Sequence, residues 1–454
     1  MKHYDLIVIG AGSGNSIPSH YFDDLSIAIV EKAKFGGTCL NVGCIPTKMF
    51  VYAADIAREI QDAAKYGLEA SLQAVDWPAI VDRIFIQRID PIAQSGEEYR
   101  KGPETPNIDV YSEHARFVDT RTLQVGKERI SADRIVIATG ARPSIPKVIA
   151  ESGVTYYTNE NILRLPQLPK SMIIQGGGFI AAEFAHVFSS LGVEVTVTNR
   201  SPLLLRKADE TISQRFTEIA TTKWNLQLGH EVTAAAETPN GIELTLDNGE
   251  VLHGEILLVA TGRTPNGDQM DLHLAGIEMD GPRIKVDEFG RTTAEGVWAL
   301  GDVSSPYQLK HVANAEMRAV RHNLAYPDDL QPMPHDHVPS AIFTNPQLAS
   351  VGMTEAEARN SGRELTIKIQ NYSDTAYGWA MEDTTGFMKV IADRNTGQLL
   401  GVHVLGPQAS TLIQQLVTVM AFDLDVREVA RNQYWIHPAL PEVTENALLG
   451  LEFA

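Results

Sequence analysis

The sequence predicts an α/β protein with two parallel-sheet domains followed by a smaller α+β domain. One observation is a pattern of strand, glycine turn, helix and strand that occurs twice, starting at Tyr4 and at Ser171. Another is the length of 454 residues, which exceeds what one hydrophobic core usually supports. The third is that such glycine turns stop after residue 332, where short alternating strands precede apolar helical stretches.

The first copy of the pattern reads YDLIVIGAGSGNS and is followed by SIAIVE, which ends at Glu31. We expect Gly10 and Gly12 to form a tight turn that opens a helix and lets the backbone approach a pyrophosphate. Glu31 lies at the distance along the chain where a carboxylate accepts hydrogen bonds from a ribose. Asn15 occupies the third motif position in place of glycine, which predicts a wider helix–strand approach or a polar contact of its own. The copy therefore predicts a Rossmann-like dinucleotide site.

The second copy reads SMIIQGGGFIAAE and is followed by VEVTVTNR, which ends at Arg200. Gly176, Gly178 and the small Ala181 occupy the three motif positions. The second strand ends without the carboxylate that would bind a free 2'-hydroxyl, and Arg206 follows Arg200 by six residues. Two guanidinium groups near a ribose suit a 2'-phosphate, which predicts NADPH. The alternative is that both arginines are solvated surface residues.

Two further segments share the ending Ala-Thr-Gly. RIVIATGARP (134–143) and ILLVATGRTPN (256–266) are apolar strands that both end in Ala-Thr-Gly, which indicates two related folds. GFMKVIAD (386–393) and LLGVHVLG (399–406) read as short alternating strands of the last domain. The Pro-rich segment 328–339 is predicted to link that domain to the rest.

Composition and charge exclude several classes of partner. With 38 basic and 57 acidic residues the formal net charge is -19, which repels phosphate backbones and anionic lipids, so we expect neither nucleic acid nor membrane as partner. No run of about 18 apolar residues is present, and the N-terminus leads directly into a strand-like segment. We therefore expect a cytoplasmic protein.

The two cysteines of the chain lie five residues apart, in GGTCLNVGCIPTK. Two cysteines cannot form a disulfide scaffold, and structural zinc would need about four ligands. A position at or near a helix start lowers the pKa of a thiol and favours the thiolate that disulfide exchange requires. Cys39 and Cys44 are therefore predicted to be a redox-active pair, and the alternative is a buried structural pair.

A disulfide reductase also needs a group that protonates the departing thiolate near neutral pH. His437 stands in YWIHPALPE, and Glu442 five residues on could orient its imidazole. Taken alone, a histidine before proline is more often structural. His335 and His337 could suggest a metal, but their Pro-rich surroundings offer no further ligand, so we predict a solvated loop and no metal.

These motifs together resemble the FAD-dependent pyridine nucleotide disulfide oxidoreductases, whose members include glutathione reductase and dihydrolipoamide dehydrogenase. The resemblance extends over nearly the whole chain, and the segment 36–48 is its most specific part. It implies that Cys39 attacks the substrate, while Cys44 contacts the flavin and forms the charge-transfer thiolate. It also implies that Lys48 and Glu183 pair near the reactive flavin nitrogen, and that Phe179 gates the nicotinamide site.

Cofactor contacts and subunit organisation also follow from the resemblance. ALGDV (299–303) resembles the second FAD motif, in which Asp302 binds the ribityl or phosphate region. The other FAD contacts implied are Gly10, Gly12, Ser13, Gly14, Glu31, Gly37, Thr38, Lys48, Ala115, Thr139 and Gly140. The NADPH contacts implied are Gly176, Gly178, Phe179, Ile180, Glu183, Arg200, Arg206 and Gly262. The family is a homodimer in which His437 and Glu442 form an acid/base dyad that enters the active site of the other subunit.

We therefore expect residues 1–147 and 263–332 to bind FAD, residues 148–262 to bind NADPH, and residues 333–454 to form the dimerisation domain. The expected activity is NADPH-dependent reduction of a low-molecular-weight disulfide. Glutathione reductase is the main alternative; dihydrolipoamide dehydrogenase should carry an acidic residue where Asn199 and Arg200 stand. A binding flavoprotein would not need all six catalytic residues, and an oxidase or diaphorase would not need the intact cysteine pair.

Overall fold

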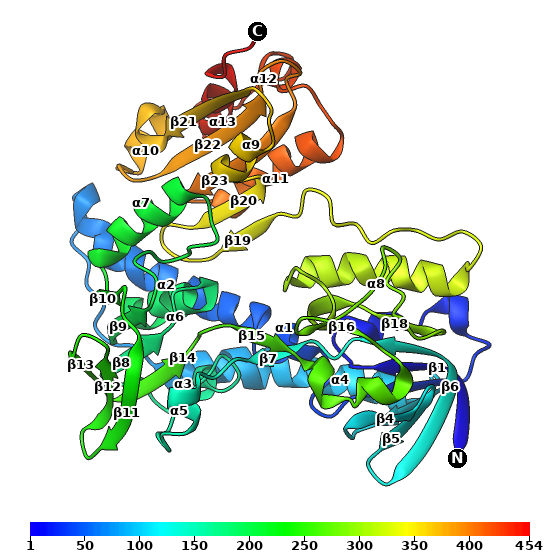
Figure 1. The fold of residues 1–454 in the computed structure, drawn as a ribbon. Coiled ribbons are helices and arrows are strands. Elements are labelled where there is room, and N and C mark those ends of the chain that lie inside the picture. The colour runs from blue at the N-terminus through cyan, green and yellow to red at the C-terminus, as the bar shows by residue number, and fades with distance from the viewer.

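The computed structural model describes all residues, 1–454, which fold into three groups of elements (Figure 1). A mixed, mainly parallel sheet near the N-terminus and a second, wholly parallel sheet, drawn in green, lie side by side. An antiparallel sheet near the C-terminus lies above them in the view. The predicted fold class, two Rossmann-like units and a C-terminal α+β unit, is confirmed.

The first sheet is built around β1 and β6. β1 pairs in parallel with both β2 and β6, β2 pairs with β3, and the C-terminal half of β6 pairs with β18. The strands are β1 (Lys2–Ile9), β2 (Ile27–Val30), β3 (Ile108–Tyr111), β4 (Ala115–Asp119), β5 (Thr122–Val125), β6 (Glu128–Ile137) and β18 (Val297–Ala299). Leu6 and Val8 pack against Val320 of α8 (Lys310–Ala325) on one face, and Ile7 packs into a core on the other. Because both faces are covered there, the second half of β1, residues 6–9, is a continuous apolar run.

The turn after β1 does not open the helix that the sequence pattern predicts. The chain forms two single 3₁₀ turns, η1 (Gly14–Ser16) and η2 (His20–Phe22). Pro18 lies between them and has no N–H group with which to continue a helical ladder. The N-terminus of an α-helix is therefore not present at this turn.

The second sheet has four parallel strands in the order β10-β9-β8-β14, and here the predicted helix follows the glycine turn. The strands are β8 (Ser171–Gln175), β9 (Glu194–Asn199), β10 (Asn225–Leu228) and β14 (Ile256–Val259). The helices are α6 (Phe179–Ser190) and α7 (Glu210–Thr221), and a small antiparallel sheet holds β11 (Val232–Thr238), β12 (Gly241–Leu246) and β13 (Val251–Gly254). Gly178 is the N-cap residue of α6, and the motif residue Ala181 is buried against the sheet.

The two Ala-Thr-Gly endings meet in space. They lead into β7 (Ala141–Pro143) and β15 (Arg263–Pro265), which pair antiparallel between the two parallel sheets (Figure 1). The long helix α2 (Cys44–Asp62) follows the short α1 (Gly37–Asn41) and packs on α6, so that Phe50 and Phe188 share one core. Apart from short 3₁₀ turns, the remaining elements of these two groups are α3 (Trp77–Val81), the π-helix η4 (Asp82–Ile89), α4 (Asp90–Lys101), α5 (Lys147–Ala150), β16 (Met279–Asp280) and β17 (Arg283–Ile284).

The C-terminal group is a five-stranded antiparallel sheet in the order β19-β20-β23-β22-β21. Its elements are β19 (Ser340–Ile342), β20 (Leu348–Gly352), α9 (Glu355–Asn360), β21 (Leu365–Asn371), α10 (Ala376–Ala380), β22 (Phe387–Asp393), β23 (Leu399–Leu405), α11 (Ala409–Ala421), α12 (Val426–Arg431) and α13 (Pro441–Leu449). The predicted half-exposed alternation is wrong for β22 and β23, because every residue of both strands is buried. These central strands are covered on both faces, so their polar residues Lys389 and His403 are buried too.

Residues 327–339 connect this group to α8 without regular secondary structure, as the Pro-rich composition indicates. The residue boundaries of the three domains stay a prediction. In the structure no helix is both long enough and apolar enough to span a membrane.

Candidate active site

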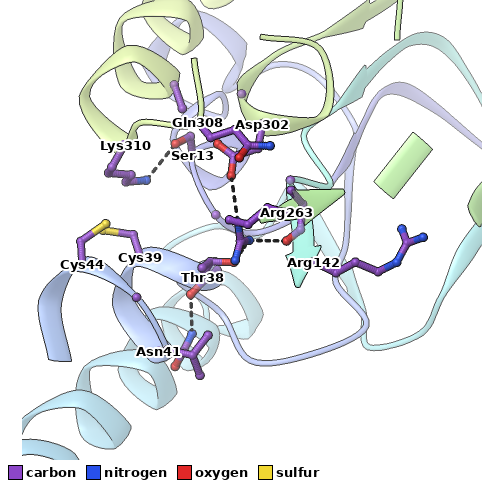
Figure 2. A pocket seen from close by; sticks show the side chains of 18 of the residues that line it. Ser13, Thr38, Cys39, Asn41, Cys44, Arg142, Arg263, Asp302, Gln308 and Lys310 are labelled. Atoms are coloured by element: carbon purple, nitrogen blue, oxygen red, sulfur yellow. Dashed lines mark hydrogen bonds and ion pairs between the residues drawn. The ribbon is translucent and has the colours of Figure 1, made fainter. Parts of the chain in front are cut away.

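A cleft of about 1260 Å³ opens between the first sheet, the α1–α2 junction, the start of α6 and the start of α8. Figure 2 shows part of it, with the two cysteines on one side and the turn of Asp302 on another. The predicted site residues that line this cleft are Gly10, Gly12, Ser13, Glu31, Gly37, Thr38, Cys39, Cys44, Lys48, Ala115, Thr139, Gly140, Phe179, Ile180, Glu183 and Asp302. The fold thus brings most of the residues assigned to FAD and to the redox pair into one cavity.

The other predicted residues lie elsewhere. Those outside the cleft are Gly14, Gly176, Gly178, Arg200, Arg206, Gly262, His437 and Glu442. Gly14 is buried behind the first turn, where a Cβ would stand 2.9 Å from the Cβ of Ala138. Close packing of the first turn is thus provided by Gly14, and the third motif position is free to hold a polar residue.

Asn15 makes the polar contact that was one of its two expected roles. Its Oδ1 accepts a hydrogen bond from Arg100 Nε at 2.9 Å, and its carbonyl oxygen accepts one from Arg100 Nη2 at 2.6 Å. Arg100 comes from α4, so the first turn is fixed to a helix that is 85 residues away in the chain. The asparagine therefore anchors the turn through its side chain.

Glu31 holds the turn after β1 from the end of β2. Its Oε2 accepts from the N–H of Ala11 at 2.8 Å, and its Oε1 accepts from the N–H of Ala33 at 2.9 Å. Each carboxylate oxygen can accept a further hydrogen bond, so the carboxylate that lines the cleft can still receive the hydroxyls of a ribose.

The cysteines stand on either side of the α1–α2 junction. Cys39 belongs to α1, and Cys44 is the first residue of the 19-residue helix α2. Both are thiols in the structure, and their side chains point toward one another (Figure 2). The hydrogen bond from Cys39 lowers the pKa of Cys44 to about 7, although burial opposes the shift. The same hydrogen bond, together with burial, raises the pKa of Cys39, so Cys44 is the thiolate of the reduced pair.

Lys48 and Glu183 enter the cleft from α2 and α6, but they do not form the direct ion pair that we expected. Glu183 Oε1 instead accepts from the backbone N–H of Phe343 at 2.8 Å, and Lys48 Nζ lies over the Phe343 ring without a hydrogen-bond partner. The backbone donor thus competes with the lysine for the carboxylate. Burial lowers the pKa of Lys48 to about 8 and raises that of Glu183 to about 7.

Two cleft residues escaped the sequence reasoning. Arg263 has a side chain that is only 6% exposed, and its Nε lies 3.9 Å from Asp302 Oδ2. Burial raises the pKa of Asp302, and the charge of Arg263 opposes that shift. Lys310, at the start of α8, donates from Nζ to Ser13 Oγ at 2.8 Å (Figure 2). The repeated Ala-Thr-Gly ending could have pointed to Arg263, whereas no local signal marks Lys310.

The residues of the cleft fit the FAD that the sequence resemblance implies. Lys48 Nζ and Thr139 Oγ1 are buried polar atoms without a partner in the protein, and both residues line the cavity. Gly12 and Gly37 approach so closely that a Cβ on Gly37 would stand 2.8 Å from Gly12 Cα. The absence of both side chains leaves bare backbone on the wall, as a pyrophosphate requires.

The second glycine turn lies at the carboxyl edge of its sheet. Gly176 has φ +136°, and a Cβ there would stand 2.3 Å from the carbonyl oxygen of Ala260. A Cβ on Gly178 would meet nothing within 4 Å, so the N-terminus of α6 is open. Arg200 follows β9, and both Arg200 and Arg206 are exposed without a hydrogen bond or ion pair in the chain. Their guanidinium groups are therefore free to meet a ligand.

His437 and Glu442 form a hydrogen-bonded pair in the C-terminal group. Nδ1 of His437 lies 2.7 Å from Glu442 Oε1, and Oε2 accepts from the backbone N–H of Ala439 at 3.2 Å. The imidazole side chain is 70% exposed and is not part of the cleft that holds the cysteines of the same chain.

His335 lies in an irregular, largely exposed loop, as predicted, but its side chain also makes a contact that the sequence did not indicate. Its Nε2 lies 2.7 Å from Oε1 of Glu316, a residue of α8 that is completely buried. The other oxygen of Glu316 accepts from the N–H of Gly301, beside Asp302. The linker is thus attached to the turn that bears Asp302. No group of three or more His, Cys, Asp or Glu side chains is arranged to hold a metal ion.

Comparison with known proteins gives matches over nearly the whole chain. It is 53% identical over 462 residues to mycothione reductase of Mycobacterium tuberculosis, covering 99% of this chain and 100% of that protein. The segments GSGNSI, CIPTKMFVYAADIA and NQYWIHPALPEVTENALLGL of the sequence resemble mycothione reductase in particular, and this comparison confirms the resemblance. A glutathione reductase of Nostoc sp. is 32% identical, with 90% of this chain and 92% of that protein covered.

A solved structure shares the fold. The HOCl-induced flavoprotein disulfide reductase RclA from Escherichia coli superposes with a TM-score of 0.87 at 27% identity, covering 98% of this chain and all of that one. Residues 4–319 match the model of the pyridine nucleotide-disulphide oxidoreductases, and residues 338–448 match the dimerisation domain of these enzymes. On this evidence the chain belongs to the pyridine nucleotide-disulphide oxidoreductase family.

Proposed function

We propose that this protein is an NADPH-dependent reductase of mycothione, which it converts to two molecules of mycothiol. The observation that carries the proposal is the pair of thiols, Cys39 and Cys44, in the wall of a cleft that fits FAD. The choice of mycothione as substrate is supported by the similarity to mycothione reductase along the full chain.

The family uses FAD and a nicotinamide nucleotide. For this chain we propose NADPH, because Arg200 and Arg206 are exposed near the second glycine turn and have no partner in the protein. Each charge-assisted bond to a 2'-phosphate would contribute about 1.5 to 3 kcal/mol. NADH lacks that phosphate and would gain nothing from either residue.

We assign the attack on the substrate to Cys39 and the flavin-side thiolate to Cys44, and the lowered pKa of Cys44 supports the second assignment. Cys39, once deprotonated, attacks one sulfur of the substrate, a mixed disulfide forms, and the first substrate thiolate leaves. Cys44, whose pKa is lowered to about 7, then attacks the sulfur of Cys39. This step releases the second thiolate and forms the Cys39–Cys44 disulfide. One substrate disulfide is thereby reduced by two electrons, and the protein pair is oxidised by two.

We assign His437 as the general acid that protonates the departing thiolates at near-neutral pH. Glu442 holds the imidazole at Nδ1, which leaves Nε2 to carry the transferred proton. Because His437 lies outside the cleft of its own chain, we propose that the protein is a homodimer in which each His437 serves the cysteines of the partner.

FAD, when bound, supplies the two-electron carrier between the nicotinamide and the Cys39–Cys44 disulfide. Glu31 and Asp302 would hold its ribose and its ribityl or phosphate region, beside the bare backbone at Gly12 and Gly37. Lys48 and Glu183 supply two titratable charges at the same wall, next to Cys44. The remaining FAD contacts proposed are Gly10, Ser13, Gly14, Thr38, Ala115, Thr139 and Gly140, and those of NADPH are Gly176, Gly178, Phe179, Ile180 and Gly262.

We also propose the domain division on which this arrangement rests. Residues 1–147 and 263–332 bind FAD, residues 148–262 bind NADPH, and residues 333–454 form the subunit interface. A cytoplasmic location agrees with a pair of thiols that must be kept reduced at the expense of NADPH.

A steady-state assay tests the function. With NADPH as donor, we expect kcat/KM for mycothione to exceed that for glutathione disulfide at least about 100-fold, because charged glutathione termini would lose water without finding partners. Comparable values for the two disulfides would favour a reductase of broad specificity. A higher value for glutathione disulfide would favour glutathione reductase instead.

A further inference from the structure

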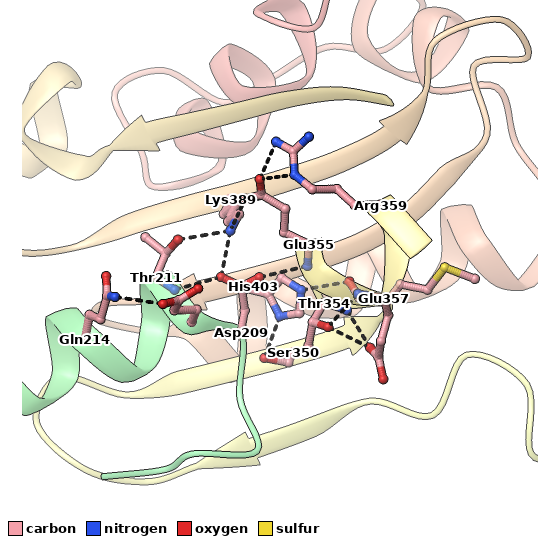
Figure 3. A network of polar contacts seen from close by, with 12 residues as sticks. Asp209, Thr211, Gln214, Ser350, Thr354, Glu355, Glu357, Arg359, Lys389 and His403 are labelled. Atoms are coloured by element: carbon pink, nitrogen blue, oxygen red, sulfur yellow. Dashed lines mark hydrogen bonds and ion pairs between the residues drawn. The ribbon is translucent and has the colours of Figure 1, made fainter. Parts of the chain in front are cut away.

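The nucleotide-binding group and the C-terminal sheet are joined by a buried ion pair that no part of the proposed chemistry uses. Lys389 of β22 and Asp209 are each only 1% exposed, and Lys389 Nζ lies 2.7 Å from Asp209 Oδ1. A second carboxylate, that of Glu355 at the start of α9, lies 2.7 Å from the same Nζ. Figure 3 shows Lys389 reaching both carboxylates and Thr211 from the sheet.

Both carboxylate oxygens of Asp209 accept hydrogen bonds. Its Oδ1 also accepts from the backbone N–H of Thr211 at 3.0 Å, which caps α7, and its Oδ2 accepts from the backbone N–H of Glu355 at 2.9 Å. The aspartate thus fixes the start of α7 to two elements of the C-terminal group. Lys389 provides the ion pair to this carboxylate and thereby compensates its buried charge.

Asp209 is also the last residue of the segment that carries the two arginines assigned to NADPH. Upstream, the N–H of Leu205 donates to the carbonyl oxygen of Gly177 at 2.7 Å, which fixes the segment to the second glycine turn. The carbonyl oxygen of Leu205 accepts from Ser213 Oγ at 2.8 Å. Arg206 therefore lies in a stretch of chain that is held at Leu205 by the nucleotide turn and at Asp209 by the C-terminal sheet.

We infer that Lys389 is a positioning residue for cofactor selection: through Asp209 it fixes the segment from which Arg206 reaches the 2'-phosphate of NADPH. This inference rests on the proposed preference for NADPH. Removing one member of a buried ion pair leaves the other charge uncompensated, so replacing Lys389 by a neutral residue removes the contact between Asp209 and β22 and favours a shift of the carboxylate toward water. That shift loosens one of the two fixed ends of the segment and displaces the guanidinium of Arg206.

The experiment uses two probes that differ only in the 2'-phosphate. The FAD-loaded dimer is titrated with 2',5'-ADP and with 5'-AMP for wild type, Lys389→Met and Asp209→Asn. We expect Lys389→Met to lower the affinity for 2',5'-ADP about tenfold, because one charge-assisted bond is partly lost. The affinity for 5'-AMP should change less than about twofold. Asp209→Asn keeps the cap of α7 and leaves Lys389 paired with Glu355, so this variant should fold even if Lys389→Met does not. We expect it to lower the affinity for 2',5'-ADP about threefold.

Further variants separate this inference from the proposal on which it rests. Arg363→Met removes an ion pair to Asp393 within the C-terminal group and should leave both affinities unchanged. Lys389→Arg should restore most of the affinity for 2',5'-ADP. In an Arg206→Ala background, Lys389→Met should have no additional selective effect, because the group that it positions is absent.

Two results would overturn the inference. One is that Arg206→Ala lowers the affinity for 2',5'-ADP, whereas Lys389→Met and Asp209→Asn leave it unchanged or lower the affinities for both probes equally. The ion pair would then only join two domains. If neither Arg206→Ala nor Arg200→Ala changes the affinity for 2',5'-ADP, the NADPH preference itself fails, and this inference fails with it.

Discussion

At the scale of single residues, the two sulfurs of the redox pair differ because one donates a hydrogen bond to the other. Cys44 is the acceptor, and its pKa falls to about 7, while the pKa of the donor Cys39 rises. The position of Cys44 at the start of α2 adds a stabilising contact from its own backbone N–H. The pKa values therefore favour Cys44 as the thiolate of the reduced pair, in agreement with the proposed attack of Cys39 on the substrate.

The reactivity of Cys44 should follow this hydrogen bond. In Cys39→Ser and Cys39→Ala, Cys44 is the only thiol of the chain, and alkylation by iodoacetamide reports its thiolate. The thiol is neutral and slow below its pKa, so the rate rises with pH through that value. We expect a midpoint near 7 in Cys39→Ser, whose hydroxyl can still donate, and a higher midpoint in Cys39→Ala. Equal midpoints in the two variants would show that the hydrogen bond is not the cause.

The preference for NADPH should depend on Arg200. We expect Arg200→Ala to raise the KM for NADPH about 10- to 100-fold, because one charge-assisted hydrogen bond is lost. The KM for NADH should stay nearly unchanged. Steady-state kinetics with both donors make the comparison. Lys147→Ala removes another exposed cation, one that contacts only Glu151, and serves as the control. An equal loss with both donors would mean that Arg200 does not contact the 2'-phosphate.

At the scale of elements, the two dinucleotide turns solve the same problem differently. The second turn leads into the 12-residue helix α6, whose open N-terminus can stabilise a pyrophosphate. The first turn leads only into a 3₁₀ turn and is held instead by Glu31 and by the bond between Asn15 and Arg100. Both first glycines have positive φ and stand against a carbonyl oxygen of the neighbouring strand end.

Two alanine substitutions should separate these roles. Gly10 has φ +107°, and a Cβ there would stand 2.3 Å from the carbonyl oxygen of Ala138, so Gly10→Ala must strain the turn. We expect it to lower stability by about 1 to 3 kcal/mol and to lose FAD. Gly178→Ala meets open space and should keep FAD and stability but weaken nicotinamide nucleotides. Flavin absorbance, thermal unfolding and nucleotide titration measure the three effects. FAD loss in both variants would contradict this division.

At the scale of the whole molecule, the proposed acid–base pair, His437 and Glu442, and the two cysteines belong to different groups of elements. His437 precedes α13 in the C-terminal group, and the cysteines lie at the α1–α2 junction below it in Figure 1. The exposure of the imidazole and its absence from the cleft make a single chain insufficient for the proposed proton transfer.

Subunit mixing tests this assembly. Cys39→Ser and His437→Ala should each be inactive as homodimers, since general acid–base catalysis is worth about 100- to 10,000-fold. A co-expressed heterodimer of the two contains one site with both residues intact and should recover about half of the wild-type activity. Flavin content and reduction by NADPH verify that the purified heterodimer is folded. If such dimers stay as inactive as their parents, His437 does not act across the interface.

The sequence by itself determined the fold class, the redox pair and the partner of His437, because each depends on residues close together in the chain. The strand and turn patterns specify the two Rossmann-like units, and five residues separate His437 from Glu442. For Asn15 it left two roles open, a wider helix–strand approach or a polar contact, and the structure shows the contact, with Arg100.

Only the tertiary structure shows which charged side chains contact one another when they lie far apart in the sequence. It separates Lys48 from the carboxylate of Glu183, joins His335 to Glu316, and buries Lys389 against Asp209 across 180 residues. The alternating pattern of β22 gave a wrong prediction because Lys389 is polar and nevertheless buried. Such pairings follow from the topology that brings distant elements into contact, and burial then makes each pairing energetically important because water no longer screens the charges.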